Sequence, residues 1–262
     1  MTAATGGSAF AGERIAKRLA RAGVASRRDA ERMIAAGRVT VDGAVITSPA
    51  INVTDAAEVS VDGRPLLEPE PSRLWRYHKP RGLLTTHRDP EGRPTIFEHL
   101  PAGLPRVISV GRLDINSEGL LLLTNDGELA RRLELPATGW LRRYRVRIHG
   151  ALSDEQIADL GRGIEIGGVH YGAIEATIDR SQGTNSWLTL GLREGKNREI
   201  RRVIEHLGGQ VTRLIRISYG PFQLGMLPPS AVEEVPTRLM KDSLKSTPRT
   251  AGAKNAHRRR PS

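Results

Sequence analysis

The sequence predicts an α+β protein in which a small domain precedes a larger one built on a mixed, largely antiparallel sheet. Helical and strand patterns mix irregularly along the chain, which is typical of α+β folds rather than of a doubly wound sheet. Its 262 residues are enough for two cores, and a Pro- and Glu-containing stretch at 67–72 is typical of a linker. We expect domains over 12–66 and 73–240, with disordered ends at 1–11 and 241–262.

The first domain begins with two predicted helices. Over residues 13–22, apolar and basic side chains fall on opposite faces, as in an amphipathic helix. A second helix is expected to begin at Ser26, where Asp29 completes a capping pattern, and to end at Gly37. Strands are expected over 38–41 and 58–61, each followed by an Asp-Gly dipeptide that favours a tight hairpin turn.

Positive charge is concentrated at the two ends of the chain. Eight Arg or Lys lie between residues 14 and 38 against two acidic residues, and seven lie between 241 and 262 against one. The net charge is +11, so the region between these ends is close to neutral. Basic ends on a neutral body favour a polyanionic partner, with nucleic acid first and an anionic membrane second. An ordinary solvated helix face is the alternative. The candidate phosphate-binding residues are Arg14, Lys17, Arg18, Arg21, Arg27, Arg28, Arg32 and Arg38.

Composition excludes several classes of site. The chain has no cysteine, which removes thiolate nucleophiles, cysteine–zinc sites and disulfides. No apolar run approaches the roughly 18 residues of a membrane span, and residues 1–12 lack the pattern of a secretion signal. Neither a P-loop nor a dinucleotide-binding fingerprint is present. We therefore expect a cytoplasmic protein that binds no membrane.

The second domain contains six predicted strands and three predicted helices. The strand patterns cover residues 74–78, 107–110, 120–123, 142–148, 186–192 and 211–218. The helical patterns cover 127–133, 153–160 with Ser153 as its cap, and a segment ending at 207.

A polar loop between two of these strands carries Arg112, Asp114, Asn116 and Ser117. Rigid strands that present a polar loop are a common way to hold a catalytic group. For a single loop carboxylate, the simpler interpretation is that Asp114 caps a turn. Two later features favour catalysis: Tyr144 on a strand, and a basic helix start near Lys196. Alone, Tyr144 would be a core residue and the basic cluster a solvated helix face, but together the three groups match cofactor-free chemistry on a base.

Three segments carry a resemblance to the RsuA/RluB family of ribosomal RNA pseudouridine synthases. Residues 111–127, which include Gly111-Arg112-Leu113-Asp114, resemble the family's signature, and 143–146 and 194–202 resemble its later motifs in order and spacing. In the first domain, residues 25–31 and 37–39 resemble the RNA-binding domain named after ribosomal protein S4. The resemblance extends over about residues 13–236.

The resemblance implies the roles of the site residues. Asp114 would be the nucleophile, Tyr144 would stack on the target uracil, and a basic residue would pair with Asp114. By position Lys196 is favoured for that pairing, with Arg198 as the alternative. Ile200 would pack under the site. The expected substrate-binding residues are Arg112, Tyr144, Lys196, Arg198 and Ile200.

The implied reaction isomerises a uridine of ribosomal RNA after the base has left its stack. The overall resemblance favours the branch of the family that modifies the large subunit. Asp114 would attack the sugar or the base, or abstract a proton. No metal, nucleotide or flavin is implied, and we expect a monomer. A non-catalytic ribosome-associated RNA binder is disfavoured by the intact residue set. An RNA methyltransferase is disfavoured because no glycine-rich loop follows a strand.

Overall fold

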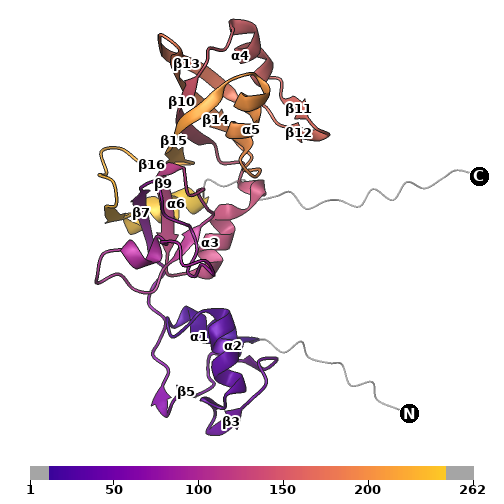
Figure 1. Cartoon of the computed structure of the whole chain (residues 1–262). Coiled ribbons are helices and arrows are strands. Elements are labelled where there is room, and N and C mark those ends of the chain that lie inside the picture. Colours follow the sequence, from indigo (N-terminus) through magenta and orange to yellow (C-terminus); the bar gives the residue numbers. More distant parts are fainter. Residues whose placement is uncertain (1–11, 246–262) are drawn as a thin grey trace, which may run out of the picture. The chain divides into compact units, whose positions relative to one another are not determined.

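The computed structural model describes residues 12–245, which form two compact units (Figure 1). The first unit holds the described residues up to 72 with two short later segments, 105–108 and 125–127, and the second holds the rest. Residues 1–11 and 246–262, where disorder is expected, lie outside the described residues. No helix within 12–245 is long and apolar enough to cross a membrane.

The first unit is a pair of helices on a small sheet. Its elements are β1 (Glu13–Arg14), α1 (Ile15–Arg21), α2 (Arg27–Ala35), β2 (Val39–Val41), β3 (Ala44–Ile46), β4 (Asn52–Val53), β5 (Val59–Val61) and β6 (Arg64–Pro65). The sheet has the order β3-β2-β5-β6 with antiparallel pairs. Ile15 and Leu19 of α1 pack with Ile34 of α2 on the sheet's buried valines, so both predicted amphipathic helices are confirmed.

Local signals account for the boundaries of these elements. The hydroxyl oxygen of Ser26 accepts a hydrogen bond from Asp29 N at 3.1 Å, which caps α2 as expected. The turn dipeptides Asp42-Gly43 and Asp62-Gly63 have positive φ at every residue, as a two-residue type I′ hairpin requires. The sequence therefore predicted the positions of both hairpin turns correctly.

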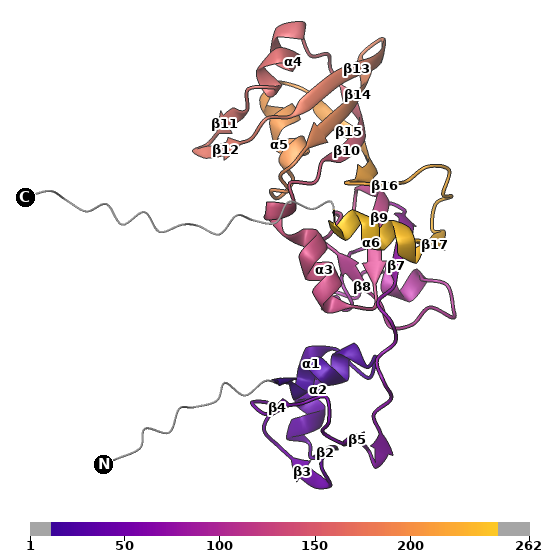
Figure 2. The same ribbon diagram turned by 180° about the vertical axis from the view of Figure 1, so that it is seen from behind.

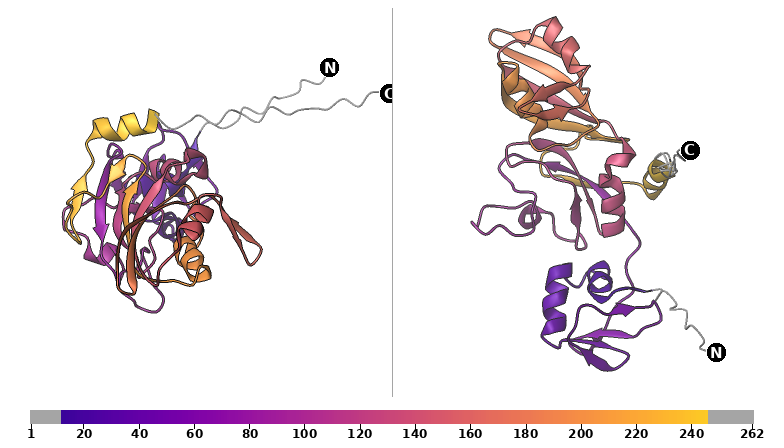
Figure 3. Two further views of the ribbon diagram at one scale, coloured as in Figure 1. Left: turned by 90° about the horizontal axis from the view of Figure 1, so that it is seen from above. Right: turned by 90° about the vertical axis from the view of Figure 1, so that its right-hand side faces the viewer.

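The second unit is built on one large sheet, which is seen from further directions in Figures 2 and 3. The strands of this unit are β7 (Leu74–Lys79), β8 (Ile108–Val110), β9 (Glu118–Thr124), β10 (Arg142–His149), β11 (Ile164–Ile166), β12 (Val169–Tyr171), β13 (Glu175–Gln182), β14 (Asn185–Leu192), β15 (Gln210–Tyr219), β16 (Phe222–Gln223) and β17 (Val232–Glu234). Strands β11 and β12 form a separate two-stranded sheet. The helices of this unit are α3 (Gly127–Glu134), α4 (Asp154–Leu160), α5 (Glu199–His206) and α6 (Thr237–Lys245), with 3-10 turns η1 (Phe97–His99) and η2 (Pro136–Thr138).

The order β13-β14-β10-β15-β9-β7-β17 confirms a mixed, largely antiparallel sheet. Of the strand neighbours along this path, only β9 and β15 run parallel. At that pairing Gly119 has φ +103°, and a Cβ there would overlap the main chain of Arg216. Glycine is therefore required where the loop that carries Asp114 enters β9.

The boundary expected at residue 240 is wrong. Residues 241–245, which composition assigned to a disordered tail, complete α6 (Figure 3). The helix buries Met240 and Ser243, which lie three residues apart on one face, and Arg132 of α3 donates to the carbonyl oxygen of Leu244 at 2.6 Å. Tertiary packing thus orders a segment whose composition alone indicated disorder.

Candidate active site

A cavity of about 880 Å³ lies in the second unit. Its lining comes from the loop after β7, the loop between β8 and β9, strands β10 and β15, and the residues that lead into α5. It brings together all six residues that the sequence marked in this domain, which are Arg112, Asp114, Tyr144, Lys196, Arg198 and Ile200. Residues that are 30 or more positions apart in sequence therefore share one concave site.

The loop that carries Asp114 is held by its main chain. Ser117 N donates to Asp114 O at 2.9 Å, and Gly82 N donates to Ile115 O at 2.8 Å. At the start of the loop, Gly111 N donates to a carboxylate oxygen of Glu134 at 2.6 Å. These bonds leave the Asp114 side chain, 38% exposed, free to face the cavity.

Lys79 is the residue beneath this loop that the sequence interpretation missed. It is 0% exposed, and its Nζ donates to the carbonyl oxygens of Pro80, Asp114 and Ser117 at 3.0, 3.2 and 3.0 Å. Burial lowers the pKa of its ammonium to about 8, although Asp114 and Glu118 oppose that shift. The available signal was strand alternation, because Trp75, Tyr77 and Lys79 share the buried face of β7.

We expect Lys79→Met to lower the free energy of unfolding by about 1–3 kcal/mol, since it leaves buried carbonyl oxygens without this partner. The stability gap should widen as pH rises from about 8 to 10.5. Over that range the unfolded lysine keeps its proton while the folded one has lost it, so folding of the wild type is increasingly favoured. Urea unfolding of both proteins at several pH values measures the gap. A gap independent of pH would contradict the buried ammonium.

The structure corrects the preferred partner of Asp114. Arg198 lies nearest, with Nη1 at 3.7 Å from Asp114 Oδ2, whereas the Lys196 ammonium pairs with Glu194. The two side chains lie in different surroundings. Arg198 adopts the left-handed conformation, with φ 51°, at the N-cap of α5, while Lys196 Nζ lies 5.8 Å from the centroid of the Tyr171 ring. The sequence preference for Lys196 was therefore wrong, and the alternative, Arg198, is the contact.

Tyr144 and Ile200 line the cavity with Asp114. Tyr144 is in the middle of β10, between Leu190 of β14 and Arg216 of β15, and is largely buried. Its hydroxyl has no hydrogen-bond partner among residues 12–245. An aromatic ring on a cavity wall, whose hydroxyl is not bonded to another protein group, is available to a planar ligand.

Two further arginines, both missed by the sequence interpretation, hold segments that line the cavity together. Arg201 of α5 donates to Asn116 O at 3.1 Å and to Val211 O at 3.2 Å, which joins α5 to the Asp114 loop. Arg142 donates to the carbonyl oxygens of Arg193 and Glu194 at 2.8 and 3.1 Å, just before the Lys196 turn. Basic clusters carry no sequence signal that separates such internal donors from solvated charges.

The basic residues of the first unit differ in their partners. Arg14 and Arg18 donate to main-chain carbonyl oxygens in the 50–55 segment. Four others pair with carboxylates: Lys17 and Arg21 with Glu13, Arg32 with Asp29, and Arg38 with Asp62. Arg27 and Arg28 are exposed and have no side-chain partner within the described residues. Of the predicted phosphate-binding set, these two therefore have the guanidinium groups most available to an external phosphate.

Comparisons with known proteins show which families this chain is similar to. A model of the family described as RNA pseudouridylate synthase matches residues 73–206, and a model of the S4 domain matches residues 13–59. An RNA pseudouridine synthase from Rickettsia bellii, named as uncharacterized, is 50% identical over 229 residues, which cover 87% of this chain and 99% of that protein. Ribosomal large subunit pseudouridine synthase B of Yersinia pestis is 43% identical over 219 residues, which cover 81% and 69%.

A crystal structure of a pseudouridylate synthase has the same fold. It matches with a TM-score of 0.63 at 22% identity, over 88% of this chain and 99% of that one. The family model spans the cavity segments up to α5, and the first unit carries an RNA-binding module. The chain therefore belongs to the RsuA/RluB family of RNA pseudouridine synthases.

Proposed function

We propose that this enzyme converts one uridine of large-subunit ribosomal RNA to pseudouridine, without a cofactor, using Asp114 as the nucleophile. One observation carries the proposal. Asp114 projects from a fixed loop into a cavity that also holds an aromatic wall, Tyr144, and a guanidinium at 3.7 Å, Arg198. A carboxylate, a cation beside it and a ring for stacking are what displacement at a flipped nucleotide needs.

The reaction is balanced within the substrate. The bond from uracil N1 to the sugar breaks, the bond from C5 to the same sugar carbon forms, and the C5 proton is exchanged for one on N1. Because substrate and product have the same atoms and oxidation state, no redox group or co-substrate is required. Asp114 would hold the sugar or the base while the uracil turns, Arg198 would balance its charge, and Tyr144 would keep the ring in the cavity.

The choice of ribosomal subunit is supported by the names of relatives. Those from Yersinia pestis and Salmonella typhi are called ribosomal large subunit pseudouridine synthase B, at 43% and 44% identity. We propose that the enzyme acts as a monomer. Relatives come from bacteria, whose ribosomes assemble in the cytoplasm, and we place the enzyme there.

The test is a map of pseudouridines in ribosomal RNA from cells with and without the gene. One large-subunit uridine should be unmodified in the deletion strain and restored by the wild-type gene. A missing site in the small subunit would overturn the substrate assignment. An unchanged map in both subunits would overturn the ribosomal RNA assignment and favour a binding role.

We expect Tyr144→Leu to slow the single-turnover conversion of the RNA by about tenfold to a hundredfold, because stacking on one base contributes about 1–3 kcal/mol. General RNA affinity should be nearly unchanged, since the remaining contacts lie elsewhere. Tyr144→Phe is the matched control for the ring and should retain most of the stacking. Equal rates for wild type and Tyr144→Leu would assign this residue to the core alone.

We expect the double variant Arg27→Gln/Arg28→Gln to flatten the salt dependence of RNA binding. Each lost phosphate contact should reduce the slope of log affinity against log salt by about 0.7–0.9. The ion-paired residues Arg32 and Arg38 provide the control double variant, which should change the slope less. The modified uridine should stay the same, because phosphate contacts carry little sequence information. Binding of one ribosomal RNA fragment at several salt concentrations measures both slopes; equal slopes for wild type and variant would rule out these contacts.

A further inference from the structure

The loop over residues 84–90 forms one side of the cavity and is fastened to the loop that carries Asp114. The Thr85 hydroxyl donates to Leu113 O at 2.8 Å and accepts from Leu113 N at 3.3 Å. Just beyond it, the Thr86 hydroxyl donates to Arg88 O at 2.9 Å and accepts from Arg88 N at 3.4 Å. The backbone of Arg88 is therefore held in a fixed relation to the catalytic loop.

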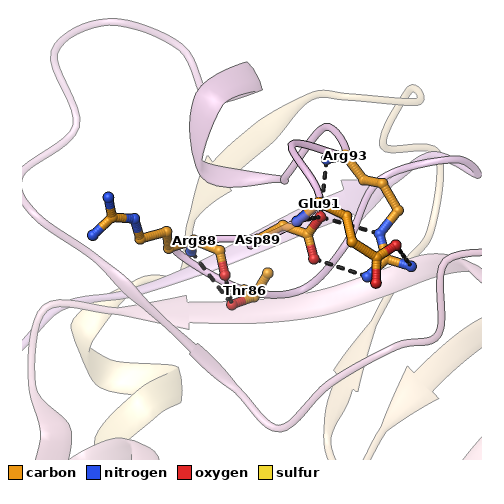
Figure 4. Close-up of polar contacts among 5 residues, drawn as sticks. All are labelled: Thr86, Arg88, Asp89, Glu91 and Arg93. Carbon is orange, nitrogen blue, oxygen red and sulfur yellow. Dashed lines mark hydrogen bonds and ion pairs between the residues drawn. The ribbon is translucent and has the colours of Figure 1, made fainter.

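Arg88 and Arg93, which lies just beyond this loop, have opposite environments (Figure 4). Arg93 donates to the carboxylate of Asp89 from Nη2 at 2.8 Å and from Nε at 3.1 Å, and its Nη1 lies 3.1 Å from a Glu91 oxygen. Hydrogen bonds from Arg93 lower the pKa of Asp89 to about 2, so this nearby carboxylate is committed to Arg93. The Arg88 side chain extends away from this cluster (Figure 4).

Arg88 is thus an uncompensated cation on the cavity wall. Five other basic residues that line the cavity have a carboxylate or carbonyl partner: Arg142, Lys196, Arg198, Arg201 and Arg216. Within residues 12–245, the guanidinium groups of Arg88 and Arg112 have none. Both side chains are exposed, but Arg112 precedes Asp114 by two residues in the same loop, whereas Arg88 belongs to a separate loop on the cavity wall.

We propose that Arg88 binds a phosphate of the RNA strand beside the target uridine and so holds the backbone at the cavity while the base occupies it. The proposal rests on the proposed function of the Asp114 cavity. A flipped nucleotide keeps a phosphate on each side of its sugar, and these charges must lie toward the exposed part of the site. A guanidinium with no internal partner, fixed by its backbone, matches a phosphate in charge and in its two-pronged geometry.

The experiment combines a protein change with a change in the RNA. Arg88→Gln is compared with wild type on an RNA fragment that contains the uridine mapped in the deletion strain, with each flanking phosphate replaced in turn by a neutral methylphosphonate. Arg147→Gln is the matched control, since Arg147 is exposed on the face of β10 opposite Tyr144. Arg88→Lys keeps the positive charge but lacks the paired N–H donors of the guanidinium.

Arg88→Gln should weaken binding of the natural fragment about tenfold and reduce the salt slope by about 0.7. At one position, the methylphosphonate should weaken RNA binding by the wild type and by the Arg147→Gln control about as much as Arg88→Gln weakens binding of the natural fragment. The same methylphosphonate should not weaken RNA binding by Arg88→Gln any further. Arg88→Lys should keep the salt slope. Additive losses at every position, or a natural fragment bound equally by Arg88→Gln and wild type, would overturn the proposal. Failure of the wild type to modify the fragment would instead count against the proposed function.

Discussion

Asp114→Asn is expected to fold like the wild type and to lose pseudouridine formation by a factor on the order of a thousand or more. The amide has the size of the carboxylate but is neither a nucleophile nor a base. It also carries no charge for Arg198 to balance across the 3.7 Å contact. Single-turnover conversion of the ribosomal RNA fragment, with enzyme in excess, measures the loss directly.

The fold of this variant should be intact because main-chain atoms hold the loop. Lys79 and Ser117 both donate to the carbonyl oxygen of Asp114, and neither bond involves the side chain that changes. Thermal unfolding should therefore coincide with wild type, and RNA affinity should remain. A variant purified free of wild-type enzyme that still turned over at an appreciable rate would remove Asp114 from its role.

Arg198→Gln is expected to reduce the rate of conversion by about a hundredfold, comparable to the loss of one preorganised charged donor in an active site. Its guanidinium is the cation that faces Asp114. Lys196→Gln should cause a loss below about fivefold, because its ammonium already pairs with Glu194 at the surface, where ion pairs contribute little. The comparison of the two variants separates the two basic residues of the turn.

Rates should be measured at saturating RNA so that binding does not obscure the chemical step. Arg198→Lys should recover part of the activity, since a positive charge returns without the planar fork. A larger loss for Lys196→Gln than for Arg198→Gln would show that Lys196 moves to Asp114 when RNA binds, and the contact seen in the free enzyme would not be the functional one.

Local patterns predicted most elements of this fold. Ser26 and Ser153 cap helices where the sequence placed them, because a cap depends on a hydroxyl and the amide three residues later. Tyr144, Val146 and Ile148 share the buried face of β10, since strand alternation is a property of consecutive residues. The hairpin β11–β12 and the edge strand β17 were not predicted, because these short segments have weak apolar patterns.

The sequence by itself determined the fold class, five of the six α-helices described, the central strands of the large sheet, and six of the residues that line the cavity. Tertiary structure decided which of those residues contact one another. Lys196 and Arg198 differ by two positions, yet the Arg198 guanidinium lies 3.7 Å from Asp114 while the Lys196 ammonium pairs with Glu194. Likewise, the buried Lys79 ammonium depends on the carbonyl oxygen of Asp114, which is 35 positions away in sequence, and Arg88 lacks a carboxylate partner because Asp89 pairs with Arg93. A side chain's partner is set by three-dimensional neighbours, which periodicity and capping patterns do not encode.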